Sequence, residues 1–359
     1  MPWAPTTTDL LDLSGVRRRA DRFRFELWQQ GFLAGTLTPD AARPPTVKVD
    51  TSRAAVRTLE SFYLPAGQMH DIDTVADRVR VVHVLQNGAE FSLGWFMWGD
   101  DSRPRRGWGS ERSSTLVDEG HRLDVGIDRT IGFGAGVDVL LVAIYMALLV
   151  IPSERISYEL TDATLTAPVS WPPGTNQVRI MTELMAGIGY LPPFFDRDNI
   201  LHFRPLPDVS DPAFEPALSY DTPRVLADSV VESDDLLDAP NRYIVYDSSG
   251  QGGGIVGHYD IPSSAPFSIA ARDGVVVPRI EAQQGIGTPA AAAKAAKALA
   301  MRDGVAYRWA SWQSPADPRH DVWDPVALLG RPYLEPAWSI SCRSGGVMTH
   351  TAKQVAWPP

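Results

Sequence analysis

The chain of 359 residues has little of what several classes of protein need. Its single cysteine, Cys342, excludes an intrachain disulfide and any metal site built from several thiolates. Its seven histidines form no His-x-x-x-His or His-Glu-x-x-His pair, so the sequence predicts no catalytic zinc site. Lysine is scarce and the formal net charge is -10, which argues against tight binding to a nucleic acid, because such proteins displace counterions with basic patches.

Signatures of membrane, nucleotide and hydrolase proteins are also missing. The most apolar run, residues 137–151, is too short to span a bilayer comfortably and contains Asp138, so we expect a buried helix there. The glycines that precede this run lack the Gly-Lys-Ser/Thr ending of a phosphate loop, and the chain has no Gly-x-Ser-x-Gly elbow. The residues Met1–Pro5 lack a basic stretch followed by an apolar core, so we expect no signal peptide.

Acid–base chemistry has one set of suspects. His320, Asp321 and Asp324 lie close together in the sequence, and a protease or a peptidoglycan hydrolase could use such groups. The alternative is a turn that leads into the next strand, and we favour this interpretation. We therefore predict a protein that is not an enzyme and that carries no cofactor and no metal.

Strand patterns dominate both ends of the chain. Residues 22–27 alternate between apolar and charged side chains, as do residues 46–50, which is typical of strands with one buried face. Residues 78–85 and 90–98 flank Asn87-Gly88, which predicts a hairpin with a type I′ turn. More helical patterns lie between the two ends, in residues 137–151 and in a second helix that we expect Thr175 to cap.

Two groups of side chains are candidates for contacts with other molecules. Tryptophans and arginines gather at residues 95–108, a mixture enriched in subunit contacts and also able to stack on sugars or bases. An acidic stretch at residues 228–238 is either a solvated loop or the lining of a channel. The candidate interface residues are Trp95, Trp98, Arg105 and Trp108, and the candidate channel-lining residues are Asp228, Glu232, Asp234 and Asp235.

Three segments in the last third of the chain, taken in order, carry a resemblance to a known family. They are the strand Asn241–Tyr246, the alanine-rich helix opened by Gly287-Thr288-Pro289, and the loop Asp321–Val326. Their order resembles the C-terminal barrel of the phage tail hub family, which includes late-control D proteins, baseplate hubs and the hub domains of type VI secretion spikes. Residues 22–27, 45–50 and 78–94 look like the opening barrel of hubs from long non-contractile tails, particularly minor tail proteins of actinobacterial siphophages.

The resemblance implies a mainly β fold of the α+β class, with two tube-like β-barrel domains and a smaller helical middle segment. Three chains would form a ring with near-sixfold character, at the tail tip of a virion assembled in the host cytoplasm. The expected parts are an N-terminal arm (residues 1–20), a first barrel (21–130), a middle domain (131–205), a linker (206–225) and a second barrel (226–359).

The same resemblance implies a structural role. The ring would join the tail tube and the distal tail protein to a central fibre or spike, and would enclose the DNA channel. The C-terminus of the tape-measure protein would be a further partner, viral DNA would pass without specific binding, and no stable membrane insertion is expected. A carbohydrate-binding module for host attachment and a cell-wall hydrolase are the alternative hypotheses.

Overall fold

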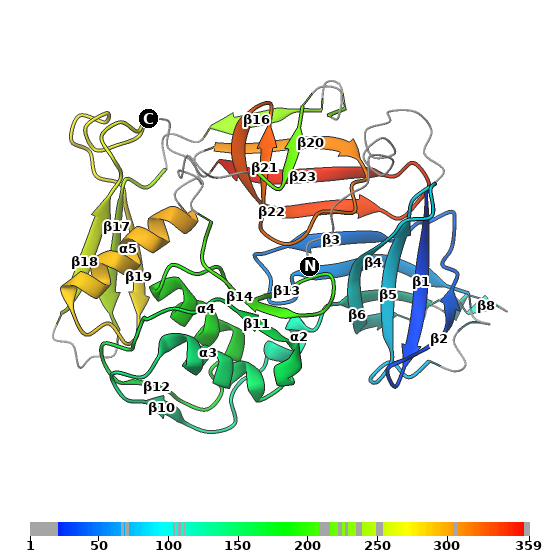
Figure 1. Ribbon diagram of the computed structural model, residues 1–359, viewed down its shortest axis with the longest axis horizontal. Coiled ribbons are helices and arrows are strands. Elements are labelled where there is room, and N and C mark those ends of the chain that lie inside the picture. Colours follow the sequence, from blue (N-terminus) through cyan, green and yellow to red (C-terminus); the bar gives the residue numbers. More distant parts are fainter. Residues whose placement is uncertain are drawn as a thin grey trace.

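The computed structural model describes residues 21–65, 68, 72–102, 105–106, 109–110, 112–207, 216–221, 225–226, 229–234, 239–248, 254–303 and 308–354. Strands make up 43% of the chain and helices 15%, which confirms the expected mainly β fold (Figure 1). None of the sheets in this described part closes into a barrel.

The largest sheet draws its strands from both ends of the chain. Thirteen strands form it, along the path β16-β20-β23-β22-β3-β4-β9-β6-β5-β1-β2, and β15 pairs with β21, which pairs with β22. The N-terminal strands are β1 (Arg22–Gln29), β2 (Phe32–Leu37), β3 (Thr46–Asp50), β4 (Arg57–Leu64), β5 (Arg78–Val84), β6 (Glu90–Ser102) and β9 (Arg112–Val117). The C-terminal strands are β15 (Leu218–Tyr220), β16 (Val231–Asp234), β20 (Arg308–Pro315), β21 (Asp324–Leu328), β22 (Arg331–Ser341) and β23 (Val347–Gln354).

The two halves of this sheet meet where β22 pairs with β3. The pairing is antiparallel and runs from Ala337 opposite Asp50 to Ser341 opposite Thr46, so the two strands lie side by side in Figure 1. Strand β3 can sit inside the sheet because Val47 and Val49 are fully buried while Lys48 between them reaches the other face. We call this pairing the seam between the N-terminal and C-terminal halves.

The predicted hairpin of β5 and β6 is present, but its turn differs from the prediction. Only Gly88 has a positive φ, of 89°, whereas a type I′ turn needs positive φ at both central residues. The Gly88 N–H donates to Leu85 O at 3.0 Å, and the Leu85 N–H donates to Ala89 O at 2.9 Å. The connection is therefore a longer turn in which glycine takes the left-handed position.

The middle of the chain has its own hydrophobic core, formed around two helices. The N-cap of α3 is Asp138, whose side chain accepts from the Leu140 N–H at 2.7 Å. The cap of α4 is Asn176 rather than the predicted Thr175, because the Asn176 side chain accepts from the Arg179 N–H. The elements are α2 (Gly120–Leu123), β10 (Ile131–Phe133), α3 (Val139–Leu148), a 3-10 turn (Ser153–Arg155), β11 (Ile156–Tyr158), β12 (Val169–Trp171), α4 (Gln177–Gly187), β13 (Phe194–Phe195) and β14 (Leu201–Phe203).

The expected helix in the apolar run exists as α3, but it is buried on one side only. Leu141 is 59% exposed and Tyr145 is 40% exposed, because the helix is apolar around its whole circumference and the core covers only part of it. Within the described part of the chain, no helix combines the length and the apolar character needed to cross a membrane.

A small α/β unit is inserted between β16 and β20. Its sheet has β17 (Arg242–Asp247) between β18 (Val256–Asp260) and β19 (Pro278–Gln283), and α5 (Pro289–Asp303) packs on it. Thr288 caps α5, since its Oγ1 accepts from the Ala291 N–H at 3.1 Å. The helix covers this three-stranded sheet and not the large one (Figure 1). A short pair, β7 (Arg105–Arg106) and β8 (Gly109–Ser110), completes the described elements.

Candidate functional site

The two described tryptophans of the candidate interface lie in different environments. Trp98 is 6% exposed and belongs to the main core, where its ring meets Phe62 edge-on. Trp95 is partly exposed, lies against Trp28 with ring centroids 5.0 Å apart, and has the Arg80 guanidinium 5.5 Å from its ring centre. Trp95 therefore has more area available to a partner, and the role of the set as a subunit contact stays a prediction.

The remaining sequence candidates are mostly outside the described residues. Trp108, Asp228 and Asp235 lie there, as do the side chains of Arg105 and Asp234. Glu232 stands on β16 and is exposed. Its carboxylate accepts from Arg331 Nη1 at 3.2 Å and from the Tyr333 hydroxyl at 3.1 Å. Glu232 is the one acidic side chain of this set that the structure describes, so a channel-lining role stays a prediction.

Both ends of the large sheet are exposed edge strands. Strand β2 pairs only with β1, and β16 pairs only with β20, among the residues that the structure describes. Phe32 and Leu33 on β2 are 77% and 54% exposed, and Val231 on β16 is 62% exposed. Such edges present unpaired backbone groups and apolar side chains, which are the features that allow another chain to add a strand. In Figure 1, β2 lies at the right of the molecule and β16 at its top.

A chain of buried polar side chains crosses the C-terminal half of the sheet. The Ser314 hydroxyl lies 2.8 Å from His350 Nε2, and His350 Nδ1 lies 2.6 Å from Glu335 Oε1. The other carboxylate oxygen of Glu335 is 2.6 Å from His320 Nδ1, and His320 Nε2 is hydrogen-bonded to the Tyr220 hydroxyl. All five side chains are at most 2% exposed. We call this set the Glu335 network.

The electrostatics of the network follow from burial and from the paired charges. Burial alone would raise the pKa of Glu335, but the charges of His320 and His350 and their hydrogen bonds lower it to about 2. Burial lowers the pKa of His320, but the negative charges of Glu335 and of nearby carboxylates raise it by more. The pKa of His320 therefore lies above the usual value. For His350 the effect of burial is larger than the effect of Glu335, so its pKa lies below the usual value. Glu335 is therefore the acidic centre of the network, and its charge favours the protonated form of His320.

Three residues of the network are hydrogen-bonded in the sequence of a catalytic triad, but a substrate could not reach them. Ser314, His350 and Glu335 follow one another as a nucleophile, a base and an orienting acid would. Ser314 is only 1% exposed, however, so its hydroxyl cannot meet a substrate in this fold. The arrangement is also unlike a zinc site, because ligands of one tetrahedral zinc lie about 3.3 Å apart, whereas these pairs are 2.6 Å apart. Its chemistry is that of a hydrogen-bonded core.

The residues considered for acid–base chemistry, His320, Asp321 and Asp324, lie in the turn before β21 and at the start of that strand. The Asp321 N–H donates to Asp324 Oδ2 at 2.6 Å, and β21 begins at Asp324, which confirms the alternative interpretation. Asp321 also forms an ion pair with Arg57 of β4, which is 1% exposed, and so links the two halves of the sheet. Sequence reasoning missed Glu335, although a carboxylate next to Tyr333-Leu334 in an apolar strand was a signal of a buried charge.

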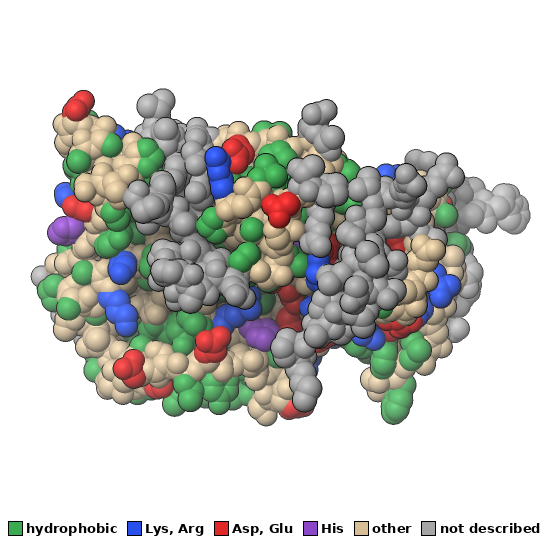
Figure 2. All heavy atoms as spheres, turned by 45° about the horizontal axis from the view of Figure 1, so that its top comes forward, with side chains coloured by type: hydrophobic (Ala, Val, Ile, Leu, Met, Phe, Trp, Pro, Cys, Tyr) green, Lys and Arg blue, Asp and Glu red, His purple; other side chains and the backbone are tan. Residues whose placement is uncertain are grey.

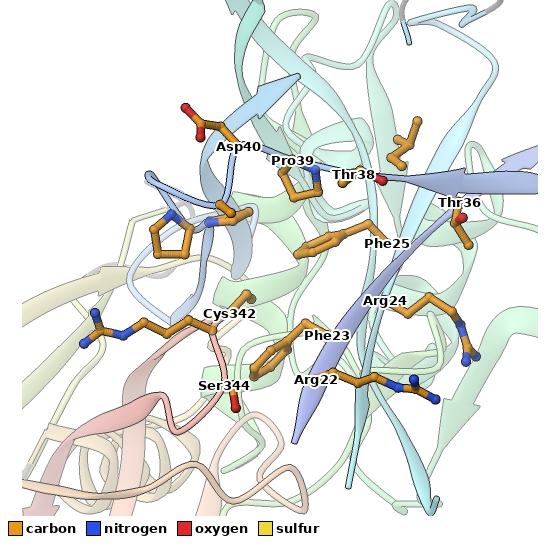
Figure 3. A pocket seen from close by; sticks show the side chains of 15 residues that line it. Arg22, Phe23, Arg24, Phe25, Thr36, Thr38, Pro39, Asp40, Cys342 and Ser344 are labelled. Carbon is orange, nitrogen blue, oxygen red and sulfur yellow. The ribbon is translucent and has the colours of Figure 1, made fainter. Parts of the chain in front are cut away.

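A groove opens at the start of β1. It has a volume of about 630 Å³ and lies between Arg22–Phe25 on one wall and Cys342–Ser344 on the other. In Figure 3 the rings of Phe23 and Phe25 point toward Cys342 and Pro39, whereas Arg22 and Arg24 point to the opposite face of the strand. The remaining lining residues are Thr36, Leu37, Thr38, Asp40, Ala41, Pro44 and Pro45.

Comparisons with known proteins place this architecture among tail proteins. No protein-family model matches the sequence, and no curated protein sequence matches it. Among solved structures, a tail protein from Neisseria meningitidis MC58 is similar with a TM-score of 0.63 and 12% identity, covering 92% of this chain and 96% of that one. The 43 kDa tail protein of prophage MuSo2 from Shewanella oneidensis has a TM-score of 0.62 and 12% identity, over 92% and 98% of the two chains.

A third solved structure agrees. The prophage tail protein gp18 from Listeria monocytogenes EGD-e has a TM-score of 0.57 and 12% identity, over 93% of this chain and 95% of that one. The chain has the fold of these tail proteins. At this identity the likeness concerns the fold, and it extends over nearly the full length of each protein.

Proposed function

We propose that the chain is a structural tail hub protein of a tailed phage. Three copies form a pseudo-hexameric ring that joins the tail tube and the distal tail protein to a central fibre or spike. The observation that carries this proposal is the open thirteen-stranded sheet, which is built from both ends of the chain and leaves β2 and β16 exposed at its two ends. The full-length fold likeness to tail proteins supports it.

The two halves of the sheet supply the tube-like units of the ring. In the proposal, the N-terminal strands and the C-terminal strands of the large sheet each give one curved unit, so three chains give six. A ring with this arrangement can meet a hexameric tube on one side and a trimeric fibre on the other. Edge strands suit the joints, because strand addition satisfies backbone groups that would otherwise remain unpaired.

The acidic charge of the chain suits a conduit for DNA. A net charge of -10 repels phosphate, so viral DNA can pass the ring without binding to it. Glu232 is the described member of the proposed lumen set, which also includes Asp228, Asp234 and Asp235. The tape-measure protein ends at this ring, at the tail tip of the virion. The role is structural, and the buried Glu335 network adds core stability rather than catalysis.

The native mass of the purified chain tests the proposal. We expect a species of three times 39.3 kDa, either alone or after mixing with the distal tail protein from the same genome. Leu33→Asp places a charge on the exposed edge β2 and should weaken this trimer, whereas Leu160→Asp, at a side chain that is 84% exposed in the middle unit, should leave it intact. A chain that stays monomeric in both samples, or a trimer that is indifferent to Leu33→Asp, would contradict the proposed ring.

A further inference from the structure

The first residues of β1 have a strand on only one side. Strand β5 pairs with β1 from Arg22 opposite Val84 to Trp28 opposite Arg78. Strand β2, on the other side, begins its pairing only at Phe25 opposite Leu37. On that side Arg22–Arg24 have no strand neighbour among the described residues, and the 630 Å³ groove lies along this open stretch.

The walls of the groove are held in place by the chain itself. The Cys342 N–H donates to Pro45 O at 2.8 Å, which joins the far wall to the segment before β3. The Gly345 N–H donates to Asp21 Oδ1 at 3.0 Å, which ties the turn after β22 to the start of β1. A preformed groove beside an open strand edge is the arrangement in which extended peptides add as an extra strand.

The two faces of an added strand would meet different chemistry. One face would lie against Phe23, Phe25 and Cys342, which are apolar and turn toward the groove (Figure 3). The other would lie on the outer side, beside Arg22 and Arg24. Because side chains alternate along a strand, the groove selects a segment in which apolar residues alternate with residues that complement arginine.

The charges around the groove indicate whether the polar residues of the bound segment should be acidic or basic. The carboxylates of Glu90 and Glu26 already pair with Arg24, at 2.6 and 2.8 Å. Asp40 is likewise paired with Arg43 at 2.7 Å. Two further arginines line the groove, are exposed and form no ion pair within the part of the chain that the structure describes; they are Arg22 and Arg343. Among the described residues, the groove therefore has one exposed arginine without an ion pair on each wall, and Arg22 shares the nearby carboxylate of Glu90 with Arg24.

We propose that the groove binds an extended segment of another protein subunit, about four to six residues long, in which apolar and acidic side chains alternate. The segment adds to the Arg22–Phe25 edge of β1 as a strand, places its apolar side chains against Phe23 and Phe25, and pairs its carboxylates with Arg22 and Arg343. This proposal stands whether or not the chain forms the ring described above, because the groove lies within one copy.

Peptide binding to the full-length chain tests this proposal. The probe is a fluorescent heptapeptide that alternates leucine and aspartate, and the matched probes alternate leucine and lysine or carry leucine and aspartate in two blocks. Fluorescence anisotropy at low salt should show saturable binding of the first probe, and at least tenfold weaker binding of the other two. Arg343→Glu should raise the Kd at least tenfold, whereas Arg129→Glu, at an exposed arginine of the middle unit, should leave it unchanged.

Hydrogen exchange shows whether the backbone takes part. The bound probe should slow exchange of amides within Arg22–Phe25 and leave amides of α4 unchanged. Equal binding of the lysine probe, equal binding by Arg343→Glu, or saturation without protection in β1 would each overturn the proposal. A chain that begins at Asp21 is the last comparison: if the probe binds only after residues 1–20 are removed, the natural occupant is that segment of the chain and not another subunit, and the proposal fails.

Discussion

The Glu335 network allows a quantitative test of where the stability of the C-terminal half resides. Glu335 is fully buried and faces an imidazole nitrogen at 2.6 Å from each of its two oxygens. Glu335→Gln keeps the size of the side chain but removes its charge, so His320 loses its ion pair and the His350 hydrogen bond is no longer charge-assisted. Buried charged contacts are worth more than neutral ones, and we expect the free energy of unfolding to fall by about 2–3 kcal/mol near neutral pH.

The same change should alter how stability depends on pH. The pKa of Glu335 is lowered from 4.5 to about 2 in the folded chain. A carboxyl with a lowered folded pKa stabilises the fold above its unfolded pKa, and this contribution is lost as the pH falls from 4.5 toward 2. The shift corresponds to about 3 kcal/mol. We therefore expect the difference in stability between wild type and Glu335→Gln to shrink as the pH falls below 4.5.

Equilibrium unfolding in urea, followed by tryptophan fluorescence at a series of pH values, measures both effects. Trp312, one of eleven tryptophans, contributes a signal from the network, since its ring stacks on His350 with centroids 4.7 Å apart. The control is Glu183→Gln, which breaks an exposed ion pair with Arg179 and should cost less than about 0.5 kcal/mol. The reasoning is refuted if Glu335→Gln costs no more than this control, or if the cost stays the same from pH 6 to pH 3.

Two further substitutions test packing and the joint between the halves of the sheet. Gly257→Ala places a Cβ 2.2 Å from the Ala293 backbone nitrogen of α5, so the helix must move; we expect a loss of about 2–3 kcal/mol in urea unfolding. Gly134→Ala, which meets open space, is its control, and equal costs would contradict the argument. Arg57→Met leaves Asp321 without its buried cation and should cost about 3–5 kcal/mol by thermal unfolding. An unchanged melting temperature would show that the ion pair contributes nothing.

Local elements were predictable where one short pattern decides them. Strict alternation predicts β1 and the β5–β6 hairpin, and the Thr288-Pro289 start predicts α5. The turn type at Asn87-Gly88 was not decided by its residues, because the same pair also fits a longer turn with glycine alone in the left-handed region. The exposure of Leu141 and Tyr145 on α3 could not be predicted from the sequence. An apolar run predicts a buried helix, but it does not show how much of the helix surface its neighbours cover.

Long-range features were beyond such patterns. Alternation shows that Val47 and Val49 share a buried face, but it does not show that their strand pairs with β22, nearly 300 residues later. The Glu335 network was missed for the same reason. Its members come from β15, β20, β22 and β23 and from the turn before β21, so that no spacing in the sequence relates them. A buried carboxylate can be suspected from one strand, but its two imidazole partners become evident only when the sheet is assembled.

In the proposed ring, the seam and the edges of the sheet would have different roles. At the seam the backbone pairing of β22 with β3 is reinforced by the Arg57–Asp321 ion pair, and the Trp338 Nε1–H donates to Asp321 O at 3.0 Å. These contacts are largely buried, so they fix the angle between the two halves within a single chain. The edges β2 and β16 each have a strand neighbour on one side only, among the residues that the structure describes. A ring that adds copies edge to edge would therefore take its curvature from an angle already set in each subunit before assembly.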